Sequence, residues 1–317
     1  MDEKAVKAVR DEIYNRMKVP PGKKVKLKDY NASWDQNNDL RGMGKEAVKD
    51  LANAALARNT EDLKAAQELL WADNTRSVLM VLQGMDAAGK DSIIKHVMSG
   101  VNPAGCQVIS FKPPSEEELD HTFLWRHMKA APAKGMIGIF NRSHYEEVLV
   151  VKVHPEMLEH EHLPSGRIGK EFWEGRYDDI NAFERYLVRN GTVVLKFFLN
   201  ISRDEQRVRF IERLSHPEKQ WKFSLSDVRE RDFWDDYMAA FEEMLSRTST
   251  EWAPWYVVPS DHKWAARSVV AEVLTTSIQE LGLKYPSVPK EDREELERIR
   301  KRLGERSKLG AIQNRLE

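Results

Sequence analysis

The chain has 317 residues, 41% of them hydrophobic, so it can bury one large core or two modest ones. Its 50 basic and 51 acidic side chains nearly cancel, which gives no global reason to expect a nucleic-acid or membrane partner. The single cysteine, Cys106, excludes an internal disulfide framework and fits a reducing compartment, so we expect a cytoplasmic protein.

The beginning of the chain is rich in charge. Residues 1–10 alternate charged residues with small ones and contain no apolar segment of the kind found in signal peptides, so we expect no targeting signal. Residues 1–45 mix a short helical pattern with a lysine-rich stretch, Lys23 to Lys28, that we interpret as an extended, solvated arm. From Lys45 to Trp71 the apolar spacing predicts a helix. Residues 1–70 are therefore expected to form an arm and helices that pack on the core.

Between Ser77 and Val258 short apolar runs alternate with segments of helical period, which is typical of a parallel sheet with helices on its faces. The sequence therefore predicts an α/β core over residues 71–288, with a lid insertion at about 203–231. Residues 289–317 are dominated by Lys, Arg and Glu and are expected to form an exposed helix or tail. The predicted strands are Val78–Leu82, Gln107–Phe111, Met136–Phe140, Thr192–Leu199 and Trp255–Val258.

A glycine-bounded loop follows the first predicted strand. Gly84-Met85-Asp86-Ala87-Ala88-Gly89-Lys90 stands between that strand and a segment, Ser92 to Met98, whose apolar residues fit one helix face. Strand, glycine loop and helix in this order are the pattern of a P-loop, in which backbone amides and a helix N-terminus hold phosphate oxygens. An ordinary glycine turn is the alternative. The lysine and both flanks favour a phosphate-binding loop over Gly84, Met85, Ala87, Ala88, Gly89, Asp91 and Ser92.

The loop departs from the usual P-loop at Asp91, where Ser or Thr normally offers a hydroxyl to magnesium. Phosphoryl transfer still needs the charge on the phosphates to be offset, so we expect a divalent cation with another ligand. Asp86 is the candidate, because a carboxylate among phosphate-holding amides is electrostatically unfavourable without a cation beside it. Ser92 is a second candidate for holding the cation, with a plain exposed helix residue as the alternative.

The third predicted strand ends in Asn141-Arg142-Ser143-His144-Tyr145-Glu146. This is the carboxyl edge of the sheet, where ligands of open α/β sheets bind. Asn141 stands where a metal-holding carboxylate is usual, and Arg142 is a candidate clamp on the transferred phosphoryl group. A surface ion pair with Glu146 is the alternative for Arg142. We expect His144 to pack or hydrogen-bond rather than act as a base.

A basic segment follows the fourth predicted strand. A solvated helix is the ordinary interpretation, but its position beside a phosphate loop favours a lid that closes over substrate. By contrast, the cluster of His154, His160, Glu161 and His162 lacks helical two-histidine spacing and is interpreted as a solvated loop rather than a metal site. The basic residues assigned to the lid are Arg203, Arg207, Arg209, Arg213, Lys219 and Lys222.

Taken together, these motifs make the chain similar to the family-2 polyphosphate kinases, over about Leu27 to Leu281. The resemblance implies a thymidylate-kinase-like P-loop fold with a helical lid, and magnesium-dependent transfer between inorganic polyphosphate and nucleotides, with manganese as a possible substitute. The form of the third-strand motif, with Asp91 after the lysine, resembles the subgroup that accepts both nucleoside mono- and diphosphates. The stretches that carry the resemblance are Gly84 to Asp91, Leu124-Trp125-Arg126 after Lys112-Pro113-Pro114, Phe140 to Glu146, and Arg209 to Arg213.

The resemblance also implies roles for individual residues. Asp86 and Asn141 would organise the metal, Lys90 and Arg142 would stabilise the moving phosphoryl group, and the lid would hold polyphosphate. Binding of the nucleotide falls to Lys112, Trp125, Arg126 and Glu146, and we expect a homo-oligomer. Two alternatives remain open, namely an ATP-dependent nucleoside monophosphate kinase and a nucleotide-binding regulator without turnover.

Overall fold

The computed structural model describes residues 16–36, 38–164, 168–221 and 223–306. They belong to two compact units that divide between Leu283 and Lys284. The first unit carries the sheet and every motif singled out above. The second contains α14, Lys290–Arg306. The expected helical pattern near the N-terminus, the proposed lid residue Lys222 and the end of the charged tail lie outside the described residues.

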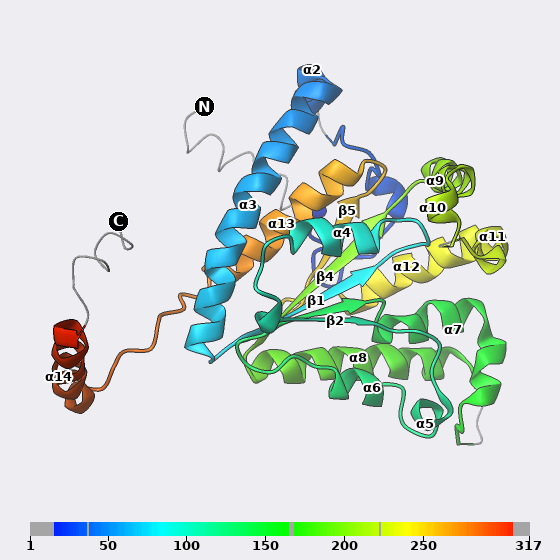
Figure 1. Cartoon of the computed structure of the whole chain (residues 1–317). Coiled ribbons are helices and arrows are strands. Elements are labelled where there is room, and N and C mark those ends of the chain that lie inside the picture. The colour runs from blue at the N-terminus through cyan, green and yellow to red at the C-terminus, as the bar shows by residue number, and fades with distance from the viewer. Residues whose placement is uncertain (1–15, 37, 165–167, 222, 307–317) are drawn as a thin grey trace. The chain divides into compact units, whose positions relative to one another are not determined.

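A five-stranded sheet with the order β2-β3-β1-β4-β5 forms the centre of the first unit, and every pairing in it is parallel (Figure 1). Each of the five predicted strands is confirmed to within about a residue at either end. The α/β fold class is confirmed as well. The strands are β1 Ser77–Gln83, β2 Cys106–Ser110, β3 Ile137–Asn141, β4 Thr192–Asn200 and β5 Trp255–Pro259.

The burial of β1 and β2 differs with their positions in the sheet. All seven residues of β1 are buried, as expected for a central strand that is covered by helices on both faces. The edge strand β2 is partly exposed, and Gln107 and Val108 face solvent. The strand order reverses at β1, with β3 on one side and β4 on the other. The loops that follow these three strands therefore meet at one sheet edge, where ligands of such folds bind.

Helices cover both faces of the sheet (Figure 1). On one face, α3 Lys45–Asp73 packs along α13 Lys263–Gln279, which also contacts α4 Lys90–Val97. On the other, α8 Lys170–Arg189 contacts β4 and α12 Trp234–Thr248. The predicted helix from residue 45 is thus confirmed, and it runs to Asp73. In the described residues, no helix has the length and apolar character needed to span a membrane.

The remaining elements are short, apart from α9, Arg203–Ser215. Helices α9, α10 and α11 occupy the region predicted as a lid. A capping box precedes the short helix that begins at Glu116, with hydrogen bonds in both directions between Ser115 and Glu118. The α-helices are α2 Asn38–Met43, α5 Glu116–Leu119, α6 Trp125–Lys129, α7 Val150–Val153, α9 Arg203–Ser215, α10 Pro217–Gln220 and α11 Leu225–Glu230. The 3₁₀ helices are Leu27–Asp29, Pro103–Gly105, His144–Val148, Pro155–His160 and Arg231–Phe233.

The lysine-rich arm is less solvated than predicted. Val25 and Leu27 are buried between exposed lysines, and their backbone amides donate to Ser246 Oγ at 2.8 Å and Glu242 Oε1 at 2.8 Å on α12. Earlier in the arm, the Val19 amide donates to the Trp255 carbonyl at 2.8 Å. The alternating pattern therefore marks an irregular segment, ending in the 3₁₀ helix Leu27–Asp29, whose apolar side chains join the core.

A buried ion pair lies between α8 and β4. The Lys196 Nζ donates to Glu184 Oε2 at 2.6 Å, to the Thr248 carbonyl at 2.6 Å and to the Tyr145 hydroxyl at 2.9 Å. Tyr145 in turn donates to Glu184 Oε1 at 2.7 Å, and the His144 Nε2 lies 3.3 Å from the same oxygen. The side chains of Lys196, Glu184 and His144 are fully buried. Because His144 and Tyr145 belong to this network, it anchors the segment that follows Arg142.

Candidate active site

The glycine loop joins β1 to α4 and has an unusual backbone. Gly84, Ala87 and Gly89 have φ values of 150°, 63° and 113°. A Cβ at Gly84 would lie 2.9 Å from the Leu199 main-chain oxygen, so only glycine fits there. A left-handed alanine is uncommon, and such strain is concentrated at functional sites. The loop geometry is therefore held by packing against β4 and the segments around it.

The Lys90 ammonium points back into the loop. Its Nζ donates to the carbonyls of Gly84 at 2.6 Å and Met85 at 3.3 Å. Burial and the nearby Arg142 lower its pKa, and the carboxylates of Asp86, Glu146 and Asp91 act in the opposite direction. Lys90 thus lies at the centre of a group of charges.

Asp86 and Arg142 bring the two loops together. The Arg142 guanidinium donates to Asp86 Oδ1 at 2.8 Å. The Arg142 backbone, with φ 63°, donates its amide to the Leu82 carbonyl of β1 at 3.2 Å. Burial alone would lower the Arg142 pKa, but the carboxylates of Glu146, Asp86 and Asp227 raise it. The structure therefore makes Asp86 the hydrogen-bonded partner of Arg142, while Glu146 contributes charge nearby.

Asn141 and Ser92 are occupied by protein contacts. The Asn141 amide donates to Asp91 Oδ1 at 2.9 Å and to Ser110 Oγ at 3.2 Å. Ser92 Oγ accepts from the Arg267 Nε at 3.1 Å and from a second guanidinium nitrogen at 2.7 Å. Arg267, on α13, was not predicted from sequence, because it lies 175 residues away from Ser92. Asp91, which occupies the position of the usual P-loop hydroxyl, therefore orients Asn141.

The donor set fits a divalent ion that is held largely by substrate. Within the residues that the structure describes, no group of three or more His, Cys, Asp or Glu side chains is placed to hold a metal. Ions that accompany nucleotide phosphates are often held by only one or two carboxylates, with phosphate oxygens and water completing the shell. Asp86, one quarter exposed and next to Lys90 and Arg142, is such a carboxylate.

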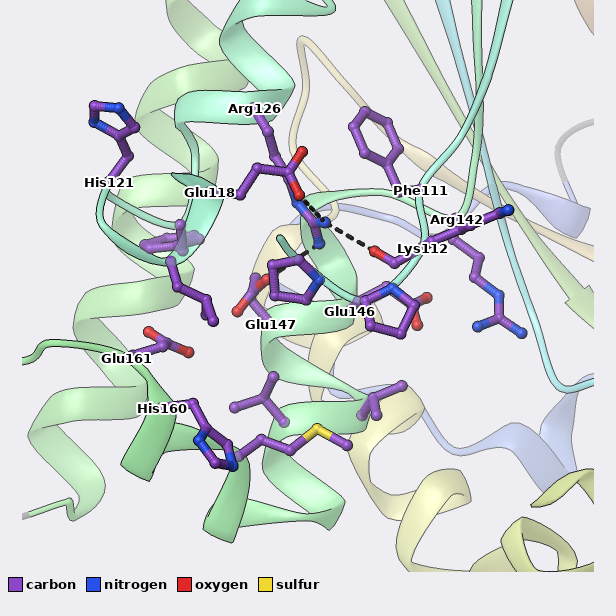
Figure 2. A pocket seen from close by; sticks show the side chains of 17 residues that line it. Phe111, Lys112, Glu118, His121, Arg126, Arg142, Glu146, Glu147, His160 and Glu161 are labelled. Atoms are coloured by element: carbon purple, nitrogen blue, oxygen red, sulfur yellow. Dashed lines mark hydrogen bonds and ion pairs between the residues drawn. The ribbon is translucent and has the colours of Figure 1, made fainter. Parts of the chain in front are cut away.

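A cavity of about 410 Å³ opens beside this site (Figure 2). Three of the residues predicted to bind nucleotide line it, Lys112, Arg126 and Glu146, and Arg142 borders it as well. Trp125 does not line it. Instead its ring stacks on His121 at 3.9 Å, with the Lys129 ammonium 4.0 Å from the ring centre. The other lining residues are Phe111, Pro113, Pro114, Glu118, Leu119, His121, Phe123, Glu147, Val150, Val151, Met157, His160 and Glu161.

Carboxylates form part of the cavity wall (Figure 2). Arg126 donates to the Lys112 carbonyl at 2.8 Å and pairs with Glu118 at 3.4 Å and Glu147 at 3.7 Å. Burial raises the pKa of Glu147 to about 7, and Arg176 and Arg126 oppose this rise. Sequence reasoning missed Glu147, although it stands directly after Glu146. It also left Glu161 in a solvated loop, whereas that side chain is only 15% exposed and ion-paired.

The lid residues divide into two groups. Arg209 was predicted to bind polyphosphate, but it is buried and its guanidinium is used by the protein. It donates to the carbonyls of Ala87 at 2.9 Å and Ala88 at 3.1 Å, to those of Ser260 and Asp261, and to Glu205 at 2.8 Å. We therefore correct its role: it fastens α9 to the phosphate loop.

The other described lid cations lie nearer to solvent. Arg213 pairs loosely with Asp227 at 3.6 Å, and Lys219 pairs with Glu212 at 2.6 Å. Arg203 and Arg207 are exposed. Unlike Arg209, these four cations are at least partly exposed, as binding to a polyanion requires. Their role in binding stays a prediction.

Comparison with known proteins places these features in a family. The family model described as Polyphosphate kinase 2 matches residues 46–285. An ADP-polyphosphate phosphotransferase of Rhodopseudomonas palustris is 47% identical over 289 residues, which are 91% of this chain and 97% of that protein. An AMP/ADP-polyphosphate phosphotransferase of Meiothermus ruber is 44% identical over 86% of this chain and 95% of its own length. A crystal structure of polyphosphate kinase 2 from Arthrobacter aurescens superimposes with a TM-score of 0.73 at 40% identity, covering 80% of this chain and 87% of that one.

Proposed function

Because this chain belongs to the polyphosphate kinase 2 family, we propose that it transfers phosphoryl groups reversibly between inorganic polyphosphate and nucleoside mono- and diphosphates. AMP would thus become ADP, and ADP would become ATP. The observation that carries the proposal is the convergence of Asp86, Lys90 and Arg142 beside a cavity of nucleotide size. The names of the two relatives, which mention ADP and AMP/ADP, support both acceptors.

The proposed reaction is an in-line displacement. A terminal phosphate oxygen of the nucleotide attacks the end phosphorus of the polymer, and the bond from that phosphorus to its bridging oxygen breaks. Lys90 and Arg142 stabilise the charge on the moving phosphoryl group. Since the nucleophile is already an anion, positioning and neutralisation of charge supply the acceleration. A divalent ion held by Asp86, with Asn141 beside it, would offset the charge of the phosphates.

The two substrates would approach from different sides. The nucleotide occupies the cavity lined by Lys112, Arg126 and Glu146. Polyphosphate runs past the glycine loop along the lid cations that reach solvent, including the partly exposed Arg213 and Lys219. We further propose that the ion is Mg²⁺, with Mn²⁺ as a substitute, and that the protein is a cytoplasmic homo-oligomer without nucleic-acid or membrane partners.

The test is an assay of donors and acceptors. AMP, ADP and GDP are each offered with polyphosphate, and AMP separately with ATP, and the products are resolved by chromatography. We expect ADP and ATP to form with polyphosphate as the donor. Turnover with ATP alone as the donor would indicate a nucleoside monophosphate kinase, and nucleotide binding without any product would indicate a regulator. Repeating the assay after chelation, with Mg²⁺ or Mn²⁺ added back, tests the choice of ion.

A further inference from the structure

Arg176 is a buried cation that the proposed reaction does not use. It lies on α8 with a side chain only 4% exposed, and it is not among the residues that line the cavity. Three aromatic rings enclose its guanidinium, and such stacking fixes a planar cation in place. The ring centres lie 4.9 Å away for Phe123, 4.8 Å for Phe172 and 5.9 Å for Trp173.

The donors of Arg176 reach two carboxylates of the cavity wall. One terminal nitrogen donates to Glu147 Oε2 at 3.0 Å and to the Glu147 main-chain oxygen at 3.1 Å. The other donates to Glu161 Oε2 at 2.5 Å. Glu147 and Glu161 come from separate segments, the 3₁₀ helix after Arg142 and the loop that follows Pro155–His160. The planar guanidinium of Arg176 therefore joins two separate segments of the cavity wall.

We propose that Arg176 is a positioning residue that holds Glu147 and Glu161 as hydrogen-bond acceptors for the nucleoside part of the nucleotide. This inference rests on the proposed function. Carboxylate oxygens accept hydrogen bonds, and Arg176 favours the ionised form of Glu147, so the two groups suit the hydroxyls of a ribose or the N–H groups of a base. They repel phosphates, which places the phosphate end of the nucleotide at Arg142 and the nucleoside end at Glu147 and Glu161.

Electrostatics explains why a fixed cation is needed there. Glu147 and Glu161 repel each other, and burial further disfavours the charged form of Glu147. The charged groups around Glu147 are Arg176 on α8, Arg126 on α6, Glu161 on the facing loop, and Glu118, which shares Arg126. Without Arg176 the two carboxylates would lose their shared geometry, and Glu147 would lose the strongest opposing charge.

The experiment measures AMP and ADP binding by calorimetry on the full-length protein without polyphosphate, and steady-state kinetics with it. In Arg176→Met we expect the nucleotide Kd and KM to rise about tenfold or more, since charged hydrogen bonds are lost. The polyphosphate KM and kcat at saturating nucleotide should be unchanged. Arg176→Lys, which keeps the charge but cannot bridge two carboxylates, should fall between Met and wild type.

Two further variants provide the controls. Arg185→Met removes an arginine from the same helix and should leave nucleotide affinity intact. The Arg185 guanidinium lies 5.0 Å from the centre of the Trp252 ring, and neither residue lines the cavity. Glu147→Gln should weaken nucleotide binding as Arg176→Met does, and the two changes together should be less than additive, because both act on one interaction.

Analogues identify the hydrogen-bond donor. If the carboxylates bind ribose, the ratio of variant to wild-type Kd should shrink for 2′-deoxy-AMP, and if they bind the base it should shrink for IMP. Equal loss for all three nucleotides would overturn the acceptor role, and so would an unchanged nucleotide Kd in Arg176→Met. If that variant does not fold, Arg176→Lys and Glu147→Gln carry the same test. Because binding is measured without polyphosphate, failure of the proposed phosphoryl transfer would be seen separately, in the turnover assay.

Discussion

Asp86, Lys90 and Arg142 belong to loops that follow neighbouring strands. Their approach follows from the parallel register, in which Leu82 of β1 pairs with Asn141 of β3, so the residues after each strand meet. Glycine at 84 and left-handed backbones at 87 and 142 then turn the chain around this point. Local sequence was enough to predict these residues, since the strand, loop and helix signals are contiguous.

The first prediction concerns the charges of the phosphate loop. Lys90→Ala and Asp86→Ala should each lower kcat by about a thousandfold or more, because each removes a charge that acts on the transferred group. Both side chains are only partly buried, so we expect the folded structure to persist. The measurement is polyphosphate-dependent ADP formation, with circular dichroism and thermal unfolding on the same samples. Full activity in either variant would remove that residue from the mechanism.

Residues that act across long sequence separations could not be predicted. Arg209 had the right type and spacing for a polyphosphate ligand, yet its acceptors on Ala87 and Ser260 lie 122 and 51 residues away. A sequence pattern indicates that an arginine is on one helix face but does not say what faces it. Glu161 shows the opposite error, because nothing near it in sequence indicates that Arg176 would bury it.

At the scale of elements, α9 is tied to the phosphate loop at its base. Gln206 Nε2 donates to the Asp86 carbonyl at 3.0 Å, one turn before Arg209 makes its own contacts with the loop. Further along, Arg213 has a loose ion pair with Asp227, and its guanidinium lies 5.6 Å from the centre of the Phe210 ring. The lid therefore has a fixed root and a more exposed outer part.

Substitutions at the two arginines of α9 should separate these parts. Arg209→Met should lower both thermal stability and kcat, because it leaves buried carbonyls of the loop without donors. Arg213→Met, a matched change one turn away, should instead raise the polyphosphate KM by a few-fold and leave the melting temperature unchanged. Kinetics with varied polyphosphate, together with thermal unfolding, compare the two. The same phenotype in both variants would contradict the division of the lid.

The ion pair between β4 and α8 gives a prediction about stability. Lys196→Met should destabilise the protein by about 3–5 kcal/mol, because it leaves the Glu184 carboxylate buried without its cation. Adding Glu184→Gln should recover part of this loss. Lys170→Met, which breaks an exposed pair with Glu174 on the same helix, should cost less than about 0.5 kcal/mol. Denaturant unfolding measures all three, and a similar cost at Lys170 and Lys196 would contradict the argument.

The element boundaries could be predicted from periodicity, because in most elements the pattern of buried and exposed residues is visible within the element's own sequence. The seven buried residues of β1 and the regular apolar spacing of α8 and α12 each give a clear signal. The arm at Val25 was harder, because two buried residues among lysines give too short a pattern. Its contacts with α12 are set by residues more than 200 positions later.

At the scale of the whole molecule, the chain divides after Leu283. The match to the family model ends at residue 285, near the same point. The residues whose burial is described in α14 are exposed or, at Ile299 and Gly304, partly so, and the helix is dominated by charge. All the proposed catalytic residues lie in the first unit.

Deletion of residues 284–317 should therefore leave kcat and both KM values close to those of the full chain. The melting temperature should also change little, since none of the deleted residues that the structure describes is a buried core residue. The comparison requires the same assays on the truncated and intact proteins. A loss of polyphosphate affinity alone would instead assign the basic residues of α14 to the polymer.

The contacts of Lys90 with Gly84 and Met85 have a consequence for how tightly phosphate is held. An entering phosphate meets an ammonium group that already donates two of its three hydrogens to carbonyls. The free energy gained when phosphate binds Lys90 is the difference between the new bonds to phosphate and the bonds to carbonyls that are lost. Counting the contacts of Lys90 with phosphate therefore overstates the affinity. The exchange also makes the loop backbone respond to occupancy, because the two carbonyls released by Lys90 must find other donors.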